Sequence, residues 1–279
     1  MSIETRIERF AAMGTRVEFH VFGPVDDEAI RAARRAVEAV DDSLTIHRPS
    51  AATALNEALA AGGSVEIGDP LLLEALALAD AAVAATGGLF DPTAGKGAPG
   101  RWSALSLDVA ASRVTAGGPV AFDFGGFGKG YALDRAVDIL RAAGVASALM
   151  SAGESSIAVI GAHPLGGGWP LAIPDPGVPG GTLAVIEVED AALSISATVG
   201  AGMLAPNRAA TVRPRDGRAI AAARTAIAVE ASGALAEAIS TALIVADAGE
   251  AAALIAAWPG HRHLFDHAVT AAAREDADV

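Results

Sequence analysis

The order of apolar and polar residues along the chain predicts a mixture of strands and helices. Between residues 16 and 22 the apolar side chains alternate with polar ones, which is typical of a strand with one buried face. Over residues 26–42 apolar residues instead recur at helical spacing behind an acidic start. Helices are expected over residues 26–42, 70–86, 130–144, 232–245 and 249–258. Strands are expected over 16–22, 146–150, 157–160, 170–173, 183–188 and 225–229, with two short strand-like runs between 104 and 115.

The sequence of these elements favours an α+β fold. Helices and strands are mixed without the steady βαβ alternation of a doubly wound sheet. We expect a single domain over residues 1–279, in which residues 164–181 are the best candidate for a weak seam because loops flank a short strand there. The last residues, 271–279, are expected to be frayed.

A glycine-rich turn over residues 123–134 (DFGGFGKGYALD) is the segment with the clearest chemistry. Glycines let backbone N–H groups approach an anion, and the positive end of the following helix and the amine of Lys129 add to the same field. The spacing fits neither a P-loop nor a dinucleotide fingerprint, so a phosphate site and a plain structural turn both remain open. Asp123 is expected to accept N–H bonds from the turn, and Asp134 to lie on the helix surface.

Composition removes several classes of function. A net charge of −13 argues against binding to nucleic acid or anionic membrane surfaces. Without cysteine the chain has no disulfides and no thiolate chemistry. No apolar run is long enough to span a membrane, and no signal peptide or lipobox is recognised, so a cytoplasmic location is expected. With Lys96 and Lys129 as the only lysines, a dinucleotide would need a local positive site or a metal ion.

Glu237 and Thr241 lie four residues apart in the helix expected over 232–245, so their side chains project from one face. A carboxylate and a hydroxyl on one face can hold a hard cation such as Mg²⁺. From spacing alone, a solvated glutamate and a core or capping threonine explain the same pattern.

The glycine turn resembles the Asp-x-Gly-Gly-x-x-Lys-Gly-Tyr-Ala-x-Asp signature of the ApbE family, the FAD:protein FMN transferases. Further matches occur in the family's order, and together they extend from residue 12 to about residue 245. They are residues 12–15 (AMGT), 48–56 (RPSAATALN), 86–93 (TGGLFDPT), 123–134, 151–156 (SAGESS) and 236–243 (AEAISTAL).

The resemblance implies an α+β fold of mixed, largely antiparallel sheets flanked by helices, and FAD as substrate or ligand. The FAD diphosphate would lie at the glycine turn, and Mg²⁺ would be held by Glu237, Thr241 and the Gly126 carbonyl. FMN would pass from FAD to a Ser or Thr of an acceptor protein, with release of AMP. The cofactor-binding residues it implies are Met13, Asn56, Asp91, Gly125, Gly126, Lys129, Gly130 and Gly153.

For several of these residues the sequence allows a second interpretation. Met13 packs on adenine or simply on the core, Asn56 bonds the flavin or caps a helix, and Asp91 lines the flavin site or shapes an Asp-Pro turn.

The chain also departs from the family pattern. The family usually carries His-Ile-x-Asp-Pro-Arg-Thr-Gly before its last strands, and here Ala210 replaces the histidine and Arg213 the aspartate of that motif. Glu237 stands in place of a metal-binding aspartate. Residues 195–197 (ISA) replace Thr-Ser-Gly. No residue is assigned as the catalytic base. Two alternatives to transfer therefore stay open: hydrolysis of FAD to FMN and AMP, and a non-catalytic FAD-binding or carrier protein.

Overall fold

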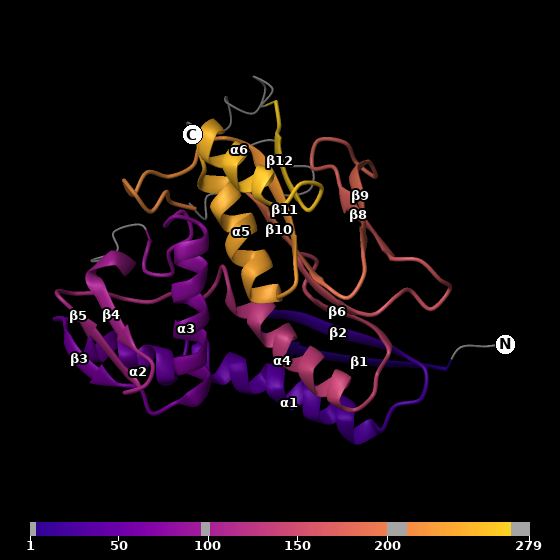
Figure 1. Ribbon diagram of the computed structural model, residues 1–279, viewed down its shortest axis with the longest axis horizontal. Coiled ribbons are helices and arrows are strands. Elements are labelled where there is room, and N and C mark those ends of the chain that lie inside the picture. The colour runs from indigo at the N-terminus through magenta and orange to yellow at the C-terminus, as the bar shows by residue number, and fades with distance from the viewer. Residues whose placement is uncertain (1–3, 96–100, 200–210, 269–279) are drawn as a thin grey trace, which may run out of the picture.

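The computed structural model describes residues 4–95, 101–199 and 211–268, and its centre is a seven-stranded sheet (Figure 1). Each neighbouring pair of strands in this sheet is antiparallel, which agrees with the expected fold class. The strands, in spatial order, are β1 (Thr5–Ala12), β2 (Thr15–Phe22), β6 (Ser147–Ala152), β7 (Ser156–Ile160), β10 (Ala192–Ala197), β11 (Arg224–Glu230) and β12 (Arg262–Asp266).

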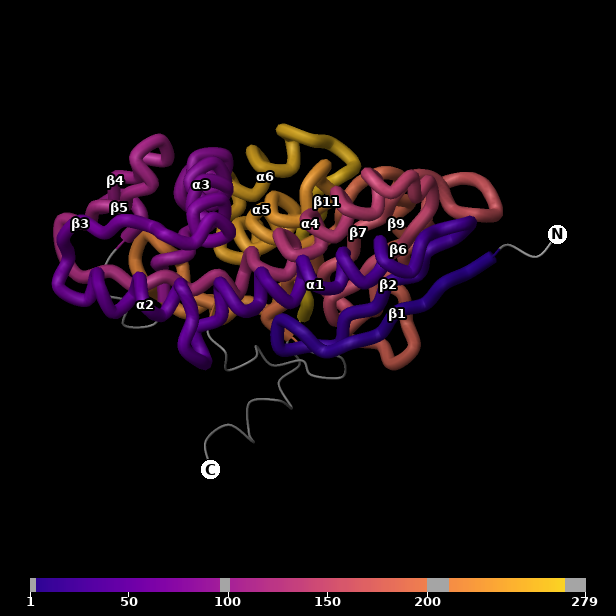
Figure 2. The backbone as a smooth tube through the Cα atoms, turned by 90° about the horizontal axis from the view of Figure 1, so that it is seen from below, coloured from indigo at the N-terminus to yellow at the C-terminus, as the bar shows by residue number. Residues whose placement is uncertain are grey.

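Helices cover one face of this sheet. Helix α4 (Gly128–Ala142) packs on β6 and β7, and α5 (Gly233–Val245) packs on β10 and β11. Helix α1 (Asp27–Leu44) lies along α4, as the view from below shows (Figure 2), and α6 (Ala248–Ala257) packs on α5 and β12. The helices come close to the sheet because the contact is built largely from alanine, including Ala226 and Ala228 on β11.

The opposite face of the sheet is covered by a hairpin of β8 (Trp169–Pro174) and β9 (Thr182–Val188). A second apolar cluster lies between them: Val159, Trp169, Ile173, Val188, Leu193, Ile227 and Val229. The expected seam at 164–181 falls in this hairpin and the loops around β8. The division into domains stays a prediction.

A smaller layer flanks the helical side of the molecule, at the left of Figure 1. It contains a three-stranded antiparallel sheet in the order β3 (Gly63–Glu66), β5 (Arg113–Ala116) and β4 (Leu105–Asp108). Helix α2 (Ala51–Ala58) leads into it, a short 3₁₀ turn (Trp102–Ala104) precedes β4, and α3 (Pro70–Ala85) connects it to α5. Within the described residues no helix combines the length and apolarity needed to cross a bilayer.

The expected elements all occur with small shifts in their ends, but six further elements of the described residues were not predicted: β1, α2, β3, the 3₁₀ turn at Trp102–Ala104, β10 and β12. The expectation of a frayed end at 271–279 concerns residues outside those described.

Helices α4 and α5 cross at a pair of glycines. A Cβ atom at Gly130 would lie 2.1 Å from the Gly233 carbonyl oxygen, so the two backbones are in direct contact. Asp134, one turn later, accepts hydrogen bonds from the Gly233 and Ala234 N–H groups, at 2.6 and 3.0 Å, and from the Ser232 hydroxyl. The expectation that Asp134 lies on the helix surface is therefore wrong. Its carboxylate closes the amino end of α5 together with the N-cap Ser232.

Burial raises the pKa of the Asp134 carboxyl, and the hydrogen bonds from Ala234, Gly233 and Ser232 oppose that rise. We expect Asp134→Ala to lower the free energy of unfolding by about 2–4 kcal/mol, because the N–H groups that it satisfies lose their acceptor. Chemical denaturation measures the change. Asp138→Ala, at an exposed position on the same helix, is the matched control. Equal stability of the two variants would contradict the assignment.

Candidate functional site

Hydrogen bonds at Asp123 hold the start of the glycine turn and leave Gly125 and Gly126 accessible. The Asp123 carboxylate accepts the Gly125 N–H at 2.8 Å, which confirms its expected role in the turn. Its own N–H donates to the Pro92 carbonyl at 2.8 Å. Gly125 and Gly126 are exposed and precede Phe127, the N-cap of α4, whose first residue is Gly128. An anion placed there would meet the positive end of the helix.

The Lys129 side chain, from the first turn of α4, contacts the Glu237 carboxylate on the neighbouring helix α5. Its Nζ lies 3.0 Å from Oε1 of Glu237, whose side chain is 4% exposed while that of Lys129 is 23% exposed. Oε1 also accepts a short hydrogen bond from the Ser156 hydroxyl on β7. The other carboxylate oxygen, Oε2, is buried and has no hydrogen-bond partner among the residues that the structure describes. A buried oxygen of this kind is costly unless a donor or a cation joins it.

The three residues predicted to hold a metal ion lie together. Glu237 and Thr241 are one turn apart on α5, and a Cβ built at Gly126 would lie 3.3 Å from the Thr241 hydroxyl oxygen. The carboxylate, hydroxyl and backbone carbonyl are the oxygen donors that Mg²⁺ takes, and the unpartnered Oε2 supplies a free lone pair. Among the described residues no cluster of three or more His, Cys, Asp or Glu side chains could hold an ion. A cation here would therefore depend on further oxygen from substrate phosphate or water.

Gly130 lies on the far side of the same turn, buried against Gly233. Its need to be glycine is explained by the helix crossing, and a role in holding cofactor stays a prediction.

Asn56 and Asp91 brace the segments that flank the glycine turn. The Asn56 side-chain amide donates to the Phe122 carbonyl at 2.9 Å and accepts the Phe122 N–H at 2.7 Å. It therefore satisfies both backbone groups of Phe122, as the backbone of an adjacent strand would. Asp91 accepts from the Thr93 N–H and hydroxyl with one oxygen and from the Trp102 N–H with the other. Both side chains are occupied by the protein in this conformation. Contact with a flavin stays a prediction for each.

A cavity of about 340 Å³ opens beside the turn. Met13 contributes to its wall with a left-handed backbone, φ 54°. Its Sδ-methyl carbon lies 2.9 Å from where a Cβ of Gly128 would be, so Met13 joins the cavity to the core. The remaining wall residues are Gly14, Asp41, Leu44, Thr45, Ile46, His47, Arg48, Asp123, Phe124 and Gly125.

Gly153 directly follows the last residue of β6, in the turn that connects β6 to β7. Its φ of 64° needs glycine, and a Cβ there would come within 2.9 Å of the Thr15 hydroxyl. Its N–H donates to the Arg16 carbonyl at 2.8 Å, which ties the 151–156 turn to β2. Its assignment to the cofactor stays a prediction.

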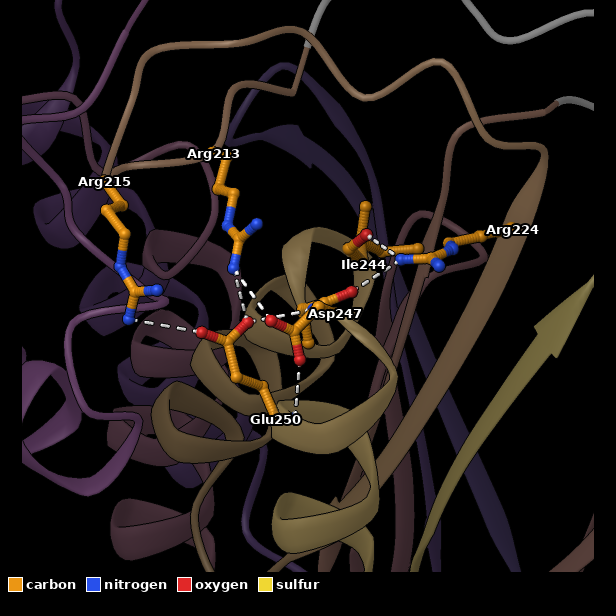
Figure 3. Close-up of polar contacts among 7 residues, drawn as sticks. Arg213, Arg215, Arg224, Ile244, Asp247 and Glu250 are labelled. Atoms are coloured by element: carbon orange, nitrogen blue, oxygen red, sulfur yellow. Dashed lines mark hydrogen bonds and ion pairs between the residues drawn. The ribbon is translucent and has the colours of Figure 1, made fainter.

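The segment that replaces the family's histidine and aspartate is tied to the start of α6 (Figure 3). Arg213 contacts Glu250 at 2.7 Å and Asp247 at 3.4 Å, and Arg215 contacts the other oxygen of Glu250 at 3.3 Å. Arg224 anchors the end of the segment by donating to the carbonyls of Ile244 and Ala246. Ala210 lies outside the described residues. An aspartate at position 213 would be repelled by the carboxylates of Asp247 and Glu250, which Arg213 contacts. The charges around this position therefore suit arginine and not the aspartate of the family motif.

The serines around Glu237 were not predicted as functional. Ser156, Ser194, Ser196 and Ser240 all lie between α5 and the sheet, and the hydroxyls of Ser194 and Ser196 both bond to that of Ser240. The signal that could have found them is serine recurring at every second residue of a strand, where inward-facing hydroxyls need partners.

Comparison with known proteins identifies relatives over most of the chain. A family model described as the ApbE family matches residues 13–265. A curated FAD:protein FMN transferase of Rhodobacter capsulatus is 30% identical over 202 residues, which cover 61% of this chain and 37% of that protein. The chain thus spans well under half the length of this curated relative.

Solved structures share the fold at lower sequence identity. The flavin transferase ApbE of Vibrio cholerae has a TM-score of 0.79 at 17% identity, covering 98% of this chain and 99% of that one. The ApbE protein of Thermotoga maritima has a TM-score of 0.77 at 21% identity, with 94% of each chain covered. The apo flavinyl transferase ApbE of Pseudomonas stutzeri has a TM-score of 0.75 at 21% identity, with 95% of each covered. The extent of the family match, together with the glycine turn and the residues behind it, shows that the chain belongs to the ApbE family.

Proposed function

We propose that the protein transfers FMN from FAD to a Ser or Thr hydroxyl of an acceptor protein and releases AMP. The observation that carries the proposal is the juxtaposition of an exposed glycine turn, the Lys129 amine and the unpartnered Oε2 of Glu237 at the start of α4. Such a site offers both hydrogen-bond donors and a cation-binding oxygen to one diphosphate.

The glycine turn and Lys129 would bind the diphosphate of FAD. The exposed backbone at Gly125 and Gly126 lets phosphate oxygens approach the amino end of α4. Lys129, already anchored on Glu237, adds a positive charge in a protein whose net charge is −13. These groups would position the phosphorus next to the flavin for attack by an incoming hydroxyl.

Mg²⁺ would be held by Glu237 Oε2, Thr241 Oγ1 and the Gly126 carbonyl, and when bound it would offset negative charge on the diphosphate as the anhydride breaks. Ser156 and Lys129 hold the carboxylate that would face this ion.

In the transfer step, the acceptor hydroxyl oxygen attacks the FMN-side phosphorus and a new P–O ester bond forms. The bond from that phosphorus to the bridging oxygen breaks, and AMP leaves with the bridging oxygen. Ala210 replaces the family's histidine and no described residue is assigned as the base, so in the proposed step the hydroxyl proton is released to solvent.

A second candidate, an FAD-binding protein that does not transfer flavin, is favoured by the Arg213 contacts. In place of an aspartate, the chain carries a guanidinium held by Glu250 and Asp247. A segment altered in this way can leave the FAD site intact while removing groups used in transfer.

One experiment separates transfer, hydrolysis and simple binding. The purified protein is incubated with FAD and Mg²⁺, with and without a Ser/Thr peptide based on the acceptor sequence of the family. Flavin attached to the peptide, seen by mass spectrometry with an equal amount of AMP, is the expected result. AMP formed equally without peptide would indicate hydrolysis, and bound FAD with no AMP would indicate a carrier; either outcome overturns transfer.

Replacing Lys129 with methionine tests the diphosphate contact. We expect the Kd for FAD to rise about 10–100-fold, since a hydrogen bond to a charged group contributes about 1.5–3 kcal/mol. Quenching of flavin fluorescence measures the Kd. Arg135→Met removes one positive charge from the same helix, where Arg135 contacts Glu74, and should leave the affinity unchanged. An equal loss in both variants would mean that only net charge matters.

A further inference from the structure

Two neighbouring serines of the central sheet face α5 but bond to different residues. Ser156 on β7 and Ser194 on β10 are directly paired across the strands, and both side chains are buried. The Ser194 hydroxyl bonds to Ser240 at 3.0 Å, whereas Ser156 donates to the Glu237 carboxylate. The sheet therefore offers the buried carboxylate one hydroxyl, from Ser156.

The hydrogen-bond donors around Glu237 are distributed unequally between its two oxygens. Ser156 Oγ and Lys129 Nζ both contact Oε1, whereas the buried Oε2 has no hydrogen-bond partner within the described ranges 4–95, 101–199 and 211–268. Rotation of the carboxylate would exchange the two oxygens unless Oε1 is held. The short side chain of Ser156 has fewer rotatable bonds than that of Lys129, so its hydroxyl restricts the orientation of the carboxylate more than the Lys129 amine does.

We propose that Ser156 is a positioning residue that orients the Glu237 carboxylate so that Oε2 is presented to a divalent cation beside Thr241 and Gly126. This inference rests on the proposed function, since it concerns the cation of that site. Glutamate carries one more rotatable bond than the aspartate that the family has here, and it loses more conformational freedom when it binds an ion. The hydrogen bond from Ser156 restricts the carboxylate before the ion arrives, as outer partners of metal ligands do.

The test measures Mn²⁺ affinity directly, by the loss of the free-ion electron paramagnetic resonance signal on titration of the full chain. We expect Ser156→Ala to raise the Kd for Mn²⁺ by about 10-fold or more, the usual effect of removing a partner that orients a metal ligand. Ser194→Ala removes the neighbouring hydroxyl, which contacts Ser240 instead, and should leave the Kd within about twofold of the wild type. Thermal unfolding of both variants without Mn²⁺ separates a loss of packing from a loss of ion binding.

Unchanged Mn²⁺ affinity in Ser156→Ala, an equal loss in both variants, or no Mn²⁺ binding by the wild type would each overturn the inference. Flavin transfer by the wild type is measured separately. Mn²⁺ binding that depends on Ser156 without any transfer would remove the proposed reaction but leave the role of Ser156. If the wild type transfers flavin but Ser156→Ala leaves the Mn²⁺ affinity unchanged, the proposed reaction stands and the role of Ser156 is overturned.

Discussion

Replacing Gly130 with alanine is expected to lower the free energy of unfolding by at least about 3 kcal/mol, the upper part of the range for overpacking a core. The added Cβ would lie 2.1 Å from the Gly233 carbonyl oxygen and 2.2 Å from its carbonyl carbon. Both atoms are backbone, so neither can turn away, and α4 and α5 would have to separate. Because Lys129 and Glu237 lie on these two helices, the same separation would lengthen their 3.0 Å contact.

Gly128→Ala is the matched control for this prediction. It lies in the same first turn of α4, so the gain in helix propensity from glycine to alanine is similar at both positions. The nearest atom to its added Cβ is the terminal methyl of Met13 at 2.9 Å, which can move. Urea denaturation of both variants should therefore show a much larger loss for Gly130→Ala. A difference below about 0.5 kcal/mol would mean that the helices adjust freely at their crossing.

The helix ends near the site could be predicted because local chemistry determines them. Pro70 is the first residue of α3, and Ser232 caps α5 by accepting the Leu235 N–H at 3.3 Å. Each of these contacts joins residues that are close in the sequence. The common face of Glu237 and Thr241 followed in the same way from the helical repeat.

Strand β10 could not be recognised because both of its faces are buried. Leu193 joins the apolar cluster under the β8–β9 hairpin, while Ser194 and Ser196 face α5 and bond to Ser240. Inward-facing serines invert the usual pattern of apolar residues inside and polar residues outside. Strand β1 was missed for a different reason: it is an edge strand in which few side chains, such as Phe10 and Ala12, are buried.

The sequence located the glycine turn but did not reveal every reason for its residues. The sequence pattern attributed its glycines to the approach of a phosphate. The structure explains Gly130 by contact with Gly233, more than one hundred residues away, and explains Asp134 by the amino end of α5. Such requirements depend on which elements meet in space, so the pattern around residue 130 alone could not reveal them.

Glu237→Gln is expected to have the largest effect on function. The substitution keeps the size of the side chain but replaces the unpartnered oxygen or its neighbour with an NH₂ group and removes the negative charge. We expect the Kd for Mn²⁺ to rise at least about 100-fold, the upper limit for losing only an outer partner of a metal ligand. If the proposed reaction is correct, FMN transfer should fall about 10²–10³-fold, as when one electrostatic stabiliser of a transition state is removed.

Glu237→Asp provides the control because it keeps the charge and shortens the side chain by one methylene. The shorter carboxylate matches the family residue. It would lie farther from Ser156 and Lys129, which in the wild type both contact Oε1 of Glu237. We therefore expect the Kd for Mn²⁺ to rise about tenfold, as for Ser156→Ala, which is far less than the rise expected for Glu237→Gln. Paired measurements of Mn²⁺ binding and peptide flavinylation decide the matter. Wild-type affinity and wild-type transfer in Glu237→Gln would show that the buried carboxylate serves packing alone, since charge at Oε2 would then have no part in binding or chemistry.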